Sequence, residues 1–171
     1  MRVLARWIIA FLAIASTAIA GDGRKSFRFK ADGFAIDFPS APITTNEAFN
    51  AATVVRTKQY YVGINSYVFM VSATLFPSEA REQVGGDKRL LRLLIDAFAA
   101  HCASHAEHPI LVRGVAAEEI HAENCEKGPA TMARYYFVDD WLYQVVVVGP
   151  RGVGISIETR QFMESFRITG H

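Results

Sequence analysis

The stretch ARYYFVDDWLYQVVVVGPRGVGISIETRQFMES, residues 133–165, contains the elements that decide the fold. It begins within an aromatic-rich run, Thr131–Val138, which ends at Asp139-Asp140, a pair typical of a turn. The run that follows, Trp141–Val148, has the strongest β propensity in the chain, and the glycine-rich loop Gly149–Gly154 ends it. The sequence therefore predicts two antiparallel strands joined by a tight turn.

The end of this stretch predicts a short helix. Ser156 can act as its N-cap, and Ile157, Phe162 and Phe166 are spaced to form the inward stripe of an amphipathic helix. A last short extended segment, Arg167–Thr169, follows. We expect this helix to close one edge of the sheet.

Two hairpins are predicted in the first half of the chain. In the first, Ser26–Lys30 and Phe34–Phe38 alternate apolar with polar residues on either side of the turn pair Asp32-Gly33. In the second, Thr53–Val62 and Tyr67–Phe76 are rich in β-branched and aromatic residues. The latter strand is apolar on both faces, which indicates a central strand covered by a helix on at least one side.

A long helix is predicted after the second hairpin. Asp87 can cap it, and its apolar residues recur at a spacing of three to four. These residues are Leu90, Leu91, Leu94, Ile95, Phe98 and Ala99. We expect the helix to reach about Ser104–Glu107 and to end before Pro109, so that it has about eighteen residues and covers the sheet.

Two other segments are less regular. Ser40–Asn50 has no clear period and is predicted to be a loop. Ile110–Asn124 is predicted to be one extended strand with a bulge near Gly114, and Cys125–Pro129 is predicted to be a turn. With the two strands described first, this segment would form a three-stranded meander.

These elements together predict the α+β class. We expect an antiparallel sheet made of two N-terminal hairpins and a C-terminal three-stranded meander, with the long helix and the short C-terminal helix packed on it. A single domain over residues 26–169 is consistent with a chain of 171 residues, 51% of them apolar. The 18 basic and 17 acidic residues are spread along the chain, so their pattern favours neither nucleic acid nor a membrane surface as a partner.

The first twenty residues have the composition of a signal peptide. Arg2 and Arg6 precede an apolar run that ends in small residues at the positions read by signal peptidase. We expect cleavage after Ala20 and a periplasmic or secreted mature protein without stable membrane insertion. The alternative is a retained anchor helix, although Trp7–Ala20 is short for an apolar layer about 30 Å thick.

The chain has two cysteines, Cys102 and Cys125. In an oxidising compartment they could form one intramolecular disulfide, which would stabilise the fold by roughly 3 kcal/mol in the chain-entropy model. The alternative is two independent buried thiols, one on a helix and one at a strand end.

A histidine-rich segment at the end of the predicted long helix has the chemistry of a metal site. On a helix, His101 and His105 would share a face, and Cys102 would lie beside His105. Zinc or copper could bind such a pair, with His108 or His121 as a third ligand. The alternative is that the macrodipole alone favours histidine at a helix C-terminus and that Cys102 is buried or bridged.

No catalytic motif is present in the sequence. Neither cysteine has the surroundings of a cysteine hydrolase, and no serine lies in a Gly-x-Ser-x-Gly elbow. Glu118-Glu119 would point to opposite faces of a strand, and Asp139-Asp140 would lie in a turn, so both pairs are expected to be structural. Gly149–Gly154 lacks the Gly-Lys-Ser/Thr of a phosphate loop. We therefore predict no catalytic residue, no cofactor and no enzymatic activity.

Three motifs carry a resemblance to a known group of exported bacterial domains. They are GFAIDFP at 33–39, WLYQVVVVGP at 141–150 and FMESFR at 162–167. With these motifs the chain resembles the PsbP-like α/β-sandwich superfamily, which includes photosystem accessory proteins and DcrB-type periplasmic lipoproteins. The resemblance implies a non-catalytic accessory or binding role. The lipid-attachment cysteine of the DcrB type is absent, so the resemblance does not imply a lipid tether.

The function that we expect is therefore an exported accessory or binding module. It would use the sheet face or the edge between helix and sheet to bind a protein partner or a small apolar ligand. An exposed subset of its aromatic residues could serve this purpose: Tyr60, Tyr61, Tyr135, Tyr136, Trp141 and Tyr143. The alternative is a periplasmic metal-binding protein centred on His101, Cys102 and His105.

Overall fold

The computed structural model describes residues 24–47, 56–126 and 128–170. Ten strands lie within these ranges: β1 (Lys25–Phe29), β2 (Phe34–Phe38), β3 (Ile43–Glu47), β4 (Arg56–Ile64), β5 (Tyr67–Leu75), β6 (Cys102–Val112), β7 (Val115–Cys125), β8 (Gly128–Val138), β9 (Trp141–Gly149) and β10 (Arg167–Ile168). The helices of the described ranges are α1 (Ser78–Gln83), α2 (Asp87–Ala99) and α3 (Ile157–Ser165), with the 3-10 turns η2 (Lys30–Asp32) and η3 (Val153–Ile155).

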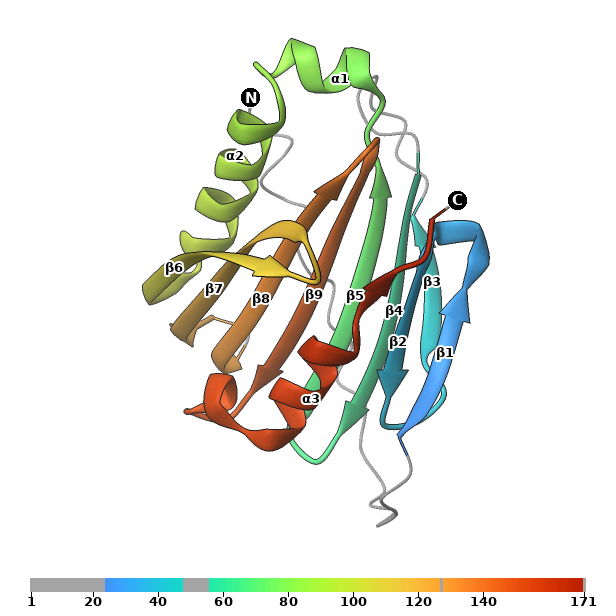
Figure 1. Cartoon of the computed structure of the whole chain (residues 1–171). Helices are drawn as coiled ribbons and strands as arrows, with labels where there is room; N and C mark the ends of the chain where they lie inside the picture. The colour runs from blue at the N-terminus through green and yellow to red at the C-terminus, as the bar shows by residue number, and fades with distance from the viewer. Residues whose placement is uncertain (1–23, 48–55, 127, 171) are drawn as a thin grey trace.

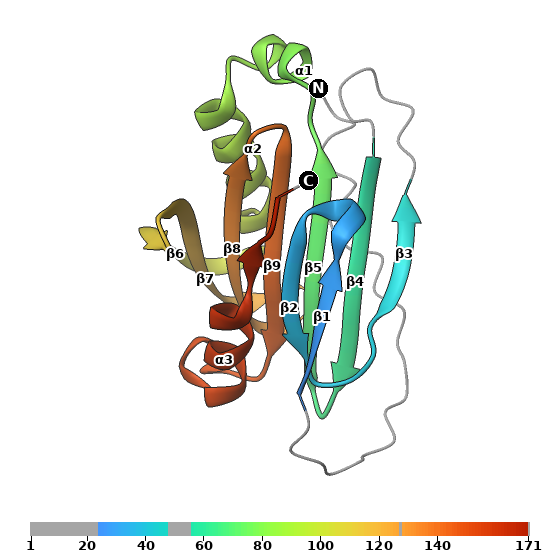
Figure 2. The same ribbon diagram turned by 45° about the vertical axis from the view of Figure 1, so that its right-hand side comes forward.

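The strands form two antiparallel sheets. A seven-stranded sheet has the order β3-β4-β5-β9-β8-β7-β6, and a three-stranded sheet has the order β1-β2-β10. Figures 1 and 2 show the small sheet and α3 on one face of the large sheet and α2 on the other. Because β9 pairs with both β5 and β8, it joins the N-terminal and C-terminal parts of the chain.

Each face of the large sheet has its own core. Alternate residues of β9 point to opposite faces, so that Tyr143, Val145 and Val147 pack with the small sheet and α3, whereas Leu142 and Val146 pack with α2. The first core also contains Phe34, Ile36, Phe38, Val71, Phe162 and Phe166, and the second contains Met70, Leu90, Ile95, Phe98, Ile120 and Tyr135. The apolar pattern on both faces of β5 and β9 is therefore explained by the layers that cover them.

The α+β class and the hairpins predicted from local patterns are confirmed. β1 and β2 pair across Asp32-Gly33, where Gly33 has a left-handed φ of 69° that suits glycine. β4 pairs with β5, and β8 pairs with β9 across Asp139-Asp140. Ser156 is the N-cap of α3, since its side chain accepts a hydrogen bond from the Thr159 backbone N–H.

The prediction for the long helix was wrong at its C-terminal end. α2 ends at Ala99, and Cys102–Val112 is a strand. Alanine, glutamate and histidine suit a helix locally, but the whole segment pairs with β7 and is bonded to it through Cys102. Tertiary pairing overrides the local preference here.

Three further predictions were wrong. Ile110–Asn124 contains a turn, not a bulge: Arg113 and Gly114 both have positive φ, which is typical of a two-residue type I′ hairpin loop. The C-terminal meander therefore has four strands, β6 to β9. Ser40–Asn50 is not all loop, because Ile43–Glu47 pairs with β4 as β3. In α3, Ile157 is exposed, and the buried Phe166 follows the helix.

A buried carboxylate attaches the first hairpin to the large sheet. The side chain of Asp32, 2% exposed, lies 3.1 Å from Lys58 Nζ and 3.4 Å from Arg56 Nη2. The Tyr60 hydroxyl donates to the same carboxylate, and the Tyr143 hydroxyl donates to the Asp32 carbonyl at 3.0 Å. Burial and then the contact with Asp32 raise the pKa of Tyr60, so its hydroxyl keeps the proton that it donates.

Replacing Asp32 with asparagine is expected to lower the free energy of unfolding by about 3 kcal/mol, because the cations of Arg56 and Lys58 lose their partner. Urea denaturation of the purified variant measures this loss. Asp37→Asn on the neighbouring strand is the control, since the Asp37 side chain forms no ion pair among the described residues. A loss below about 1 kcal/mol for Asp32→Asn would show that the attachment does not depend on charge.

Candidate functional site

The β6–β7 hairpin lies at one edge of the large sheet. β6 forms one edge of the sheet, and most of its side chains are exposed. Leu111, near the tip, is 73% exposed. The hairpin twists away from the plane of the other strands (Figures 1 and 2), and Arg113 at its tip reaches the Glu164 carbonyl of α3 at 3.5 Å. It therefore presents an edge and a tip to solvent.

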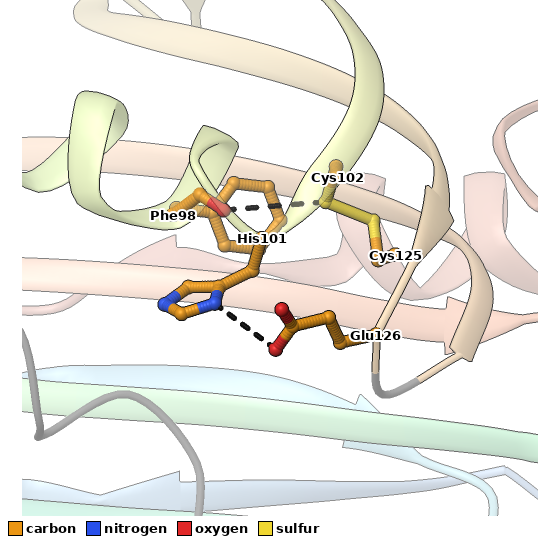
Figure 3. Close-up of a disulfide and its surroundings, with 5 residues drawn as sticks. All are labelled: Phe98, His101, Cys102, Cys125 and Glu126. Atoms are coloured by element: carbon orange, nitrogen blue, oxygen red, sulfur yellow. Dashed lines mark hydrogen bonds and ion pairs between the residues drawn. A yellow bond between two sulfur atoms is a disulfide. The ribbon is translucent and has the colours of Figure 1, made fainter.

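A disulfide closes the base of this hairpin. Cys102 at the start of β6 is bonded to Cys125 at the end of β7, with 3.9 Å between the Cα atoms (Figure 3). Beside it, the Glu126 backbone N–H donates to the His101 carbonyl at 2.9 Å, and the side chains of the same two residues pair at 3.2 Å. The hairpin is thus covalently joined at the end opposite its tip.

A Cys102→Ala/Cys125→Ala double variant is expected to lose about 3 kcal/mol of unfolding free energy, because the bridge restricts the unfolded chain. Urea denaturation measures the loss, and reduced wild-type protein should match the variant. A thiol titration under denaturing, non-reducing conditions is the direct check. Two free thiols in protein produced in an oxidising compartment would contradict the bridge.

The predicted metal trio is not brought together. His101 precedes β6 and pairs with Glu126, whereas His105 lies on β6 and pairs with Glu107 at 3.0 Å. The sulfur of Cys102 is bonded to Cys125 and is not a free thiolate. The helical spacing on which the hypothesis depended is therefore absent. In the described ranges no three His, Cys, Asp or Glu side chains are grouped so that they could hold a metal ion.

A different polar cluster lies on the hairpin face that is turned toward α3. Glu119 and His121 are two residues apart on β7 and so share this face, and Arg134 of β8 is directly opposite Glu119. His121 Nε2 donates to Glu119 Oε1 at 2.7 Å, and Arg134 Nε donates to Glu119 Oε2 at 2.7 Å. His108 of β6 pairs with Glu119 in the register, and its ring lies 6.0 Å from that of His121.

Burial and hydrogen bonding together set the pKa of Glu119 in this cluster. Burial by itself would raise the pKa of Glu119, but the hydrogen bonds from His121 and Arg134 outweigh it, and the pKa is lowered. The carboxylate, 14% exposed, therefore stays ionised and orients both partners. Tyr136, two residues from Arg134 on the same face of β8, is buried beside this cluster, and its burial raises the pKa of its hydroxyl.

The β9–α3 connection fixes the position of the His121 ring. A Cβ atom on Gly154 of η3 would come within 2.5 Å of His121 Nδ1, so only glycine leaves room for the imidazole. A carboxylate and an oriented imidazole are parts of many hydrolytic sites, but a nucleophile is needed as well. Among the described residues, no serine, threonine or cysteine side chain is hydrogen-bonded to His121. The cluster therefore has side chains that can form ion pairs and contact a ligand, without a nucleophile bonded to His121.

Sequence reasoning missed this cluster. It assigned Glu119 a structural role, named His121 only as a distant metal ligand and did not consider Arg134. A Glu-x-His pair on a predicted strand places both side chains on one face, and this was the signal available. The arginine could not be found in this way, because the register of β7 against β8 is needed to place it.

Glu119→Gln is expected to lower the free energy of unfolding by about 2 kcal/mol at pH 7, because Arg134 loses its charged partner. Since folding lowers the pKa of Glu119 from 4.5, the stabilisation is present above that value and is lost as the pH falls through the lower folded-state pKa. The difference between wild type and variant should therefore shrink as the pH falls below 4.5.

The control for this measurement is Glu118→Gln, which alters the adjacent carboxylate on the opposite face of β7. Chemical denaturation across the pH range gives both curves. An effect of Glu119→Gln that does not change with pH would contradict the role of the ionised carboxylate.

Comparison with solved structures decides what this architecture is. The solution structure of cyanobacterial PsbP (CyanoP) from Synechocystis sp. PCC 6803 aligns with a TM-score of 0.52 and 13% sequence identity, over 91% of this chain and 98% of that chain. The chain has a PsbP-like fold. No protein-family model and no curated protein sequence matches it.

The motifs that suggested this architecture are packing elements of the PsbP-like fold. GFAIDFP contains β2, whose phenylalanines and isoleucine are fully buried against the large sheet. WLYQVVVVGP contains the central strand β9, and FMESFR ends α3 and leads into β10. Most of these residues are buried in the core, so the motifs report on packing and fold.

The expected export signal lies outside the described residues, and cleavage after Ala20 stays a prediction. Within the described ranges, no helix has the length and apolar character needed to cross a membrane.

Proposed function

We propose that this protein is an exported, non-catalytic accessory module and that a protein partner docks on the β6–β7 hairpin. The polar cluster of His108, Glu119, His121 and Arg134 is the observation that carries the proposal. Its ion pairs are already formed at 2.7 Å, so a partner meets charges that are in place. Such preorganisation reduces the entropy that binding costs.

Two features of the hairpin support a protein over a small apolar ligand. The face that carries the cluster is charged and polar, whereas pockets for small apolar ligands are mostly apolar. Leu111 near the tip is exposed on the other face of the hairpin, so a protein that wraps around the β6 edge would also meet an apolar side chain.

A photo-crosslinking amino acid at position 111 tests the proposal. In the native envelope fraction we expect one crosslinked partner, and we expect a His108→Ala/His121→Ala background to reduce its yield at least tenfold. The matched control is the same probe at Ile43 on β3, which is also exposed but lies at the opposite edge of the large sheet. Equal yields from both positions, or a yield that the histidine substitutions do not change, would contradict docking on the hairpin.

A further inference from the structure

β6 forms a long outer edge of the large sheet. It has 11 residues, whereas β3 at the opposite edge has 5, and no strand of the described ranges pairs with its outer side (Figure 1). Every second residue of an edge strand directs its N–H and C=O away from the sheet, so the edge is a template for a further strand. Residues 103–106 are exposed one after another, which leaves both faces of this edge accessible.

β6 lacks the usual protection of an edge against pairing. Natural edge strands often carry lysine, but β6 contains neither lysine nor arginine. Apart from its histidines, its only charged residue is Glu107, which already pairs with Arg92 of α2 at 2.6 Å. Pro109 removes a backbone donor only at the far end of the exposed segment. Residues 102–108 are therefore open to a partner strand.

This segment is complementary to itself in an antiparallel pair. Centred on Ala106, the pair places His105 of each copy opposite Glu107 of the other. Ser104 then lies opposite His108, and the two small Ala106 side chains face each other at the axis. His105 and Glu107 already contact each other within one strand at 3.0 Å, on the face toward α2. Two histidines and two glutamates therefore alternate around the axis, so each carboxylate has a hydrogen-bond donor across the strands.

Neighbouring registers lack this complementarity. Centred on His105, the pair places two His105 rings opposite each other. Centred on Glu107, it places two carboxylates opposite each other, which is destabilising. A shift by a single residue would turn each side chain to the other face of the sheet. The side chains thus favour the register centred on Ala106.

We infer that β6 pairs antiparallel with β6 of a second copy of this chain, with Ala106 at the two-fold axis. The pair joins two seven-stranded sheets into one, and both copies contribute the same surface. Main-chain hydrogen bonds supply the affinity, and the side chains select the register. Self-complementarity favours a second copy over a foreign peptide. Pairing of the two edges does not depend on the proposed partner of the hairpin cluster, because the purified chain alone is sufficient for it.

Ala106→Cys tests the register. Directly opposite Cα atoms lie about 5 Å apart, within reach of a disulfide. Under mild oxidation of the purified chain we expect at least ten times as much covalent dimer as with Ala103→Cys, which is also exposed but lies opposite Pro109 in this register. Peptide mapping should show the bond between the two copies of residue 106, with Cys102 still bonded to Cys125. Equal yields from both positions, or no dimer from position 106, would overturn the inference.

Sedimentation velocity measures the association without added cysteines. We expect Ala106→Lys to raise the dissociation constant of the dimer at least tenfold, because two ammonium groups meet at the axis. The matched control is Ala116→Lys, an exposed alanine of β7. His105→Glu should weaken the dimer about tenfold, and His105→Glu/Glu107→His should restore it. A wild-type chain that is monomeric at about 100 µM, or a dimer that Ala106→Lys does not weaken, would contradict edge pairing.

Discussion

The burial of β9 on both faces is the constraint on which the rest of the structure depends. Its valines and aromatic residues alternate between two apolar cores, so each face of the large sheet must be covered. The small sheet and α3 cover one face, and α2 covers the other (Figures 1 and 2). Asp32 then attaches the β1–β2 hairpin to the large sheet through paired charges, since an unpaired carboxylate could not be buried there.

The surfaces that we connect with function lie where this core ends. The β6–β7 hairpin forms one edge of the large sheet, and a disulfide joins its two strands at the base. Gly154, in the connection between β9 and α3, packs against His121 of the hairpin cluster.

Local chemistry was sufficient to predict the elements that close over short distances. The turn at Asp32-Gly33, the turn at Asp139-Asp140 and the cap at Ser156 were predicted correctly because each depends on residues within a few positions. The segment after Ala99 was predicted incorrectly for the opposite reason. Its residues tolerate a helix, and only pairing with β7 makes it a strand.

The candidate site residues show the same contrast between local sequence and distant pairing. The metal hypothesis for His101, Cys102 and His105 relied on helical spacing, which is absent because α2 ends at Ala99 and both Cys102 and His105 lie on β6. By itself the sequence determined the α+β class, the hairpin turns and the apolar runs that form the core, because period and turn chemistry are local. The tertiary structure alone decided that Arg134 meets Glu119 and that Arg24 reaches Glu158, because register and the packing of distant segments set those contacts.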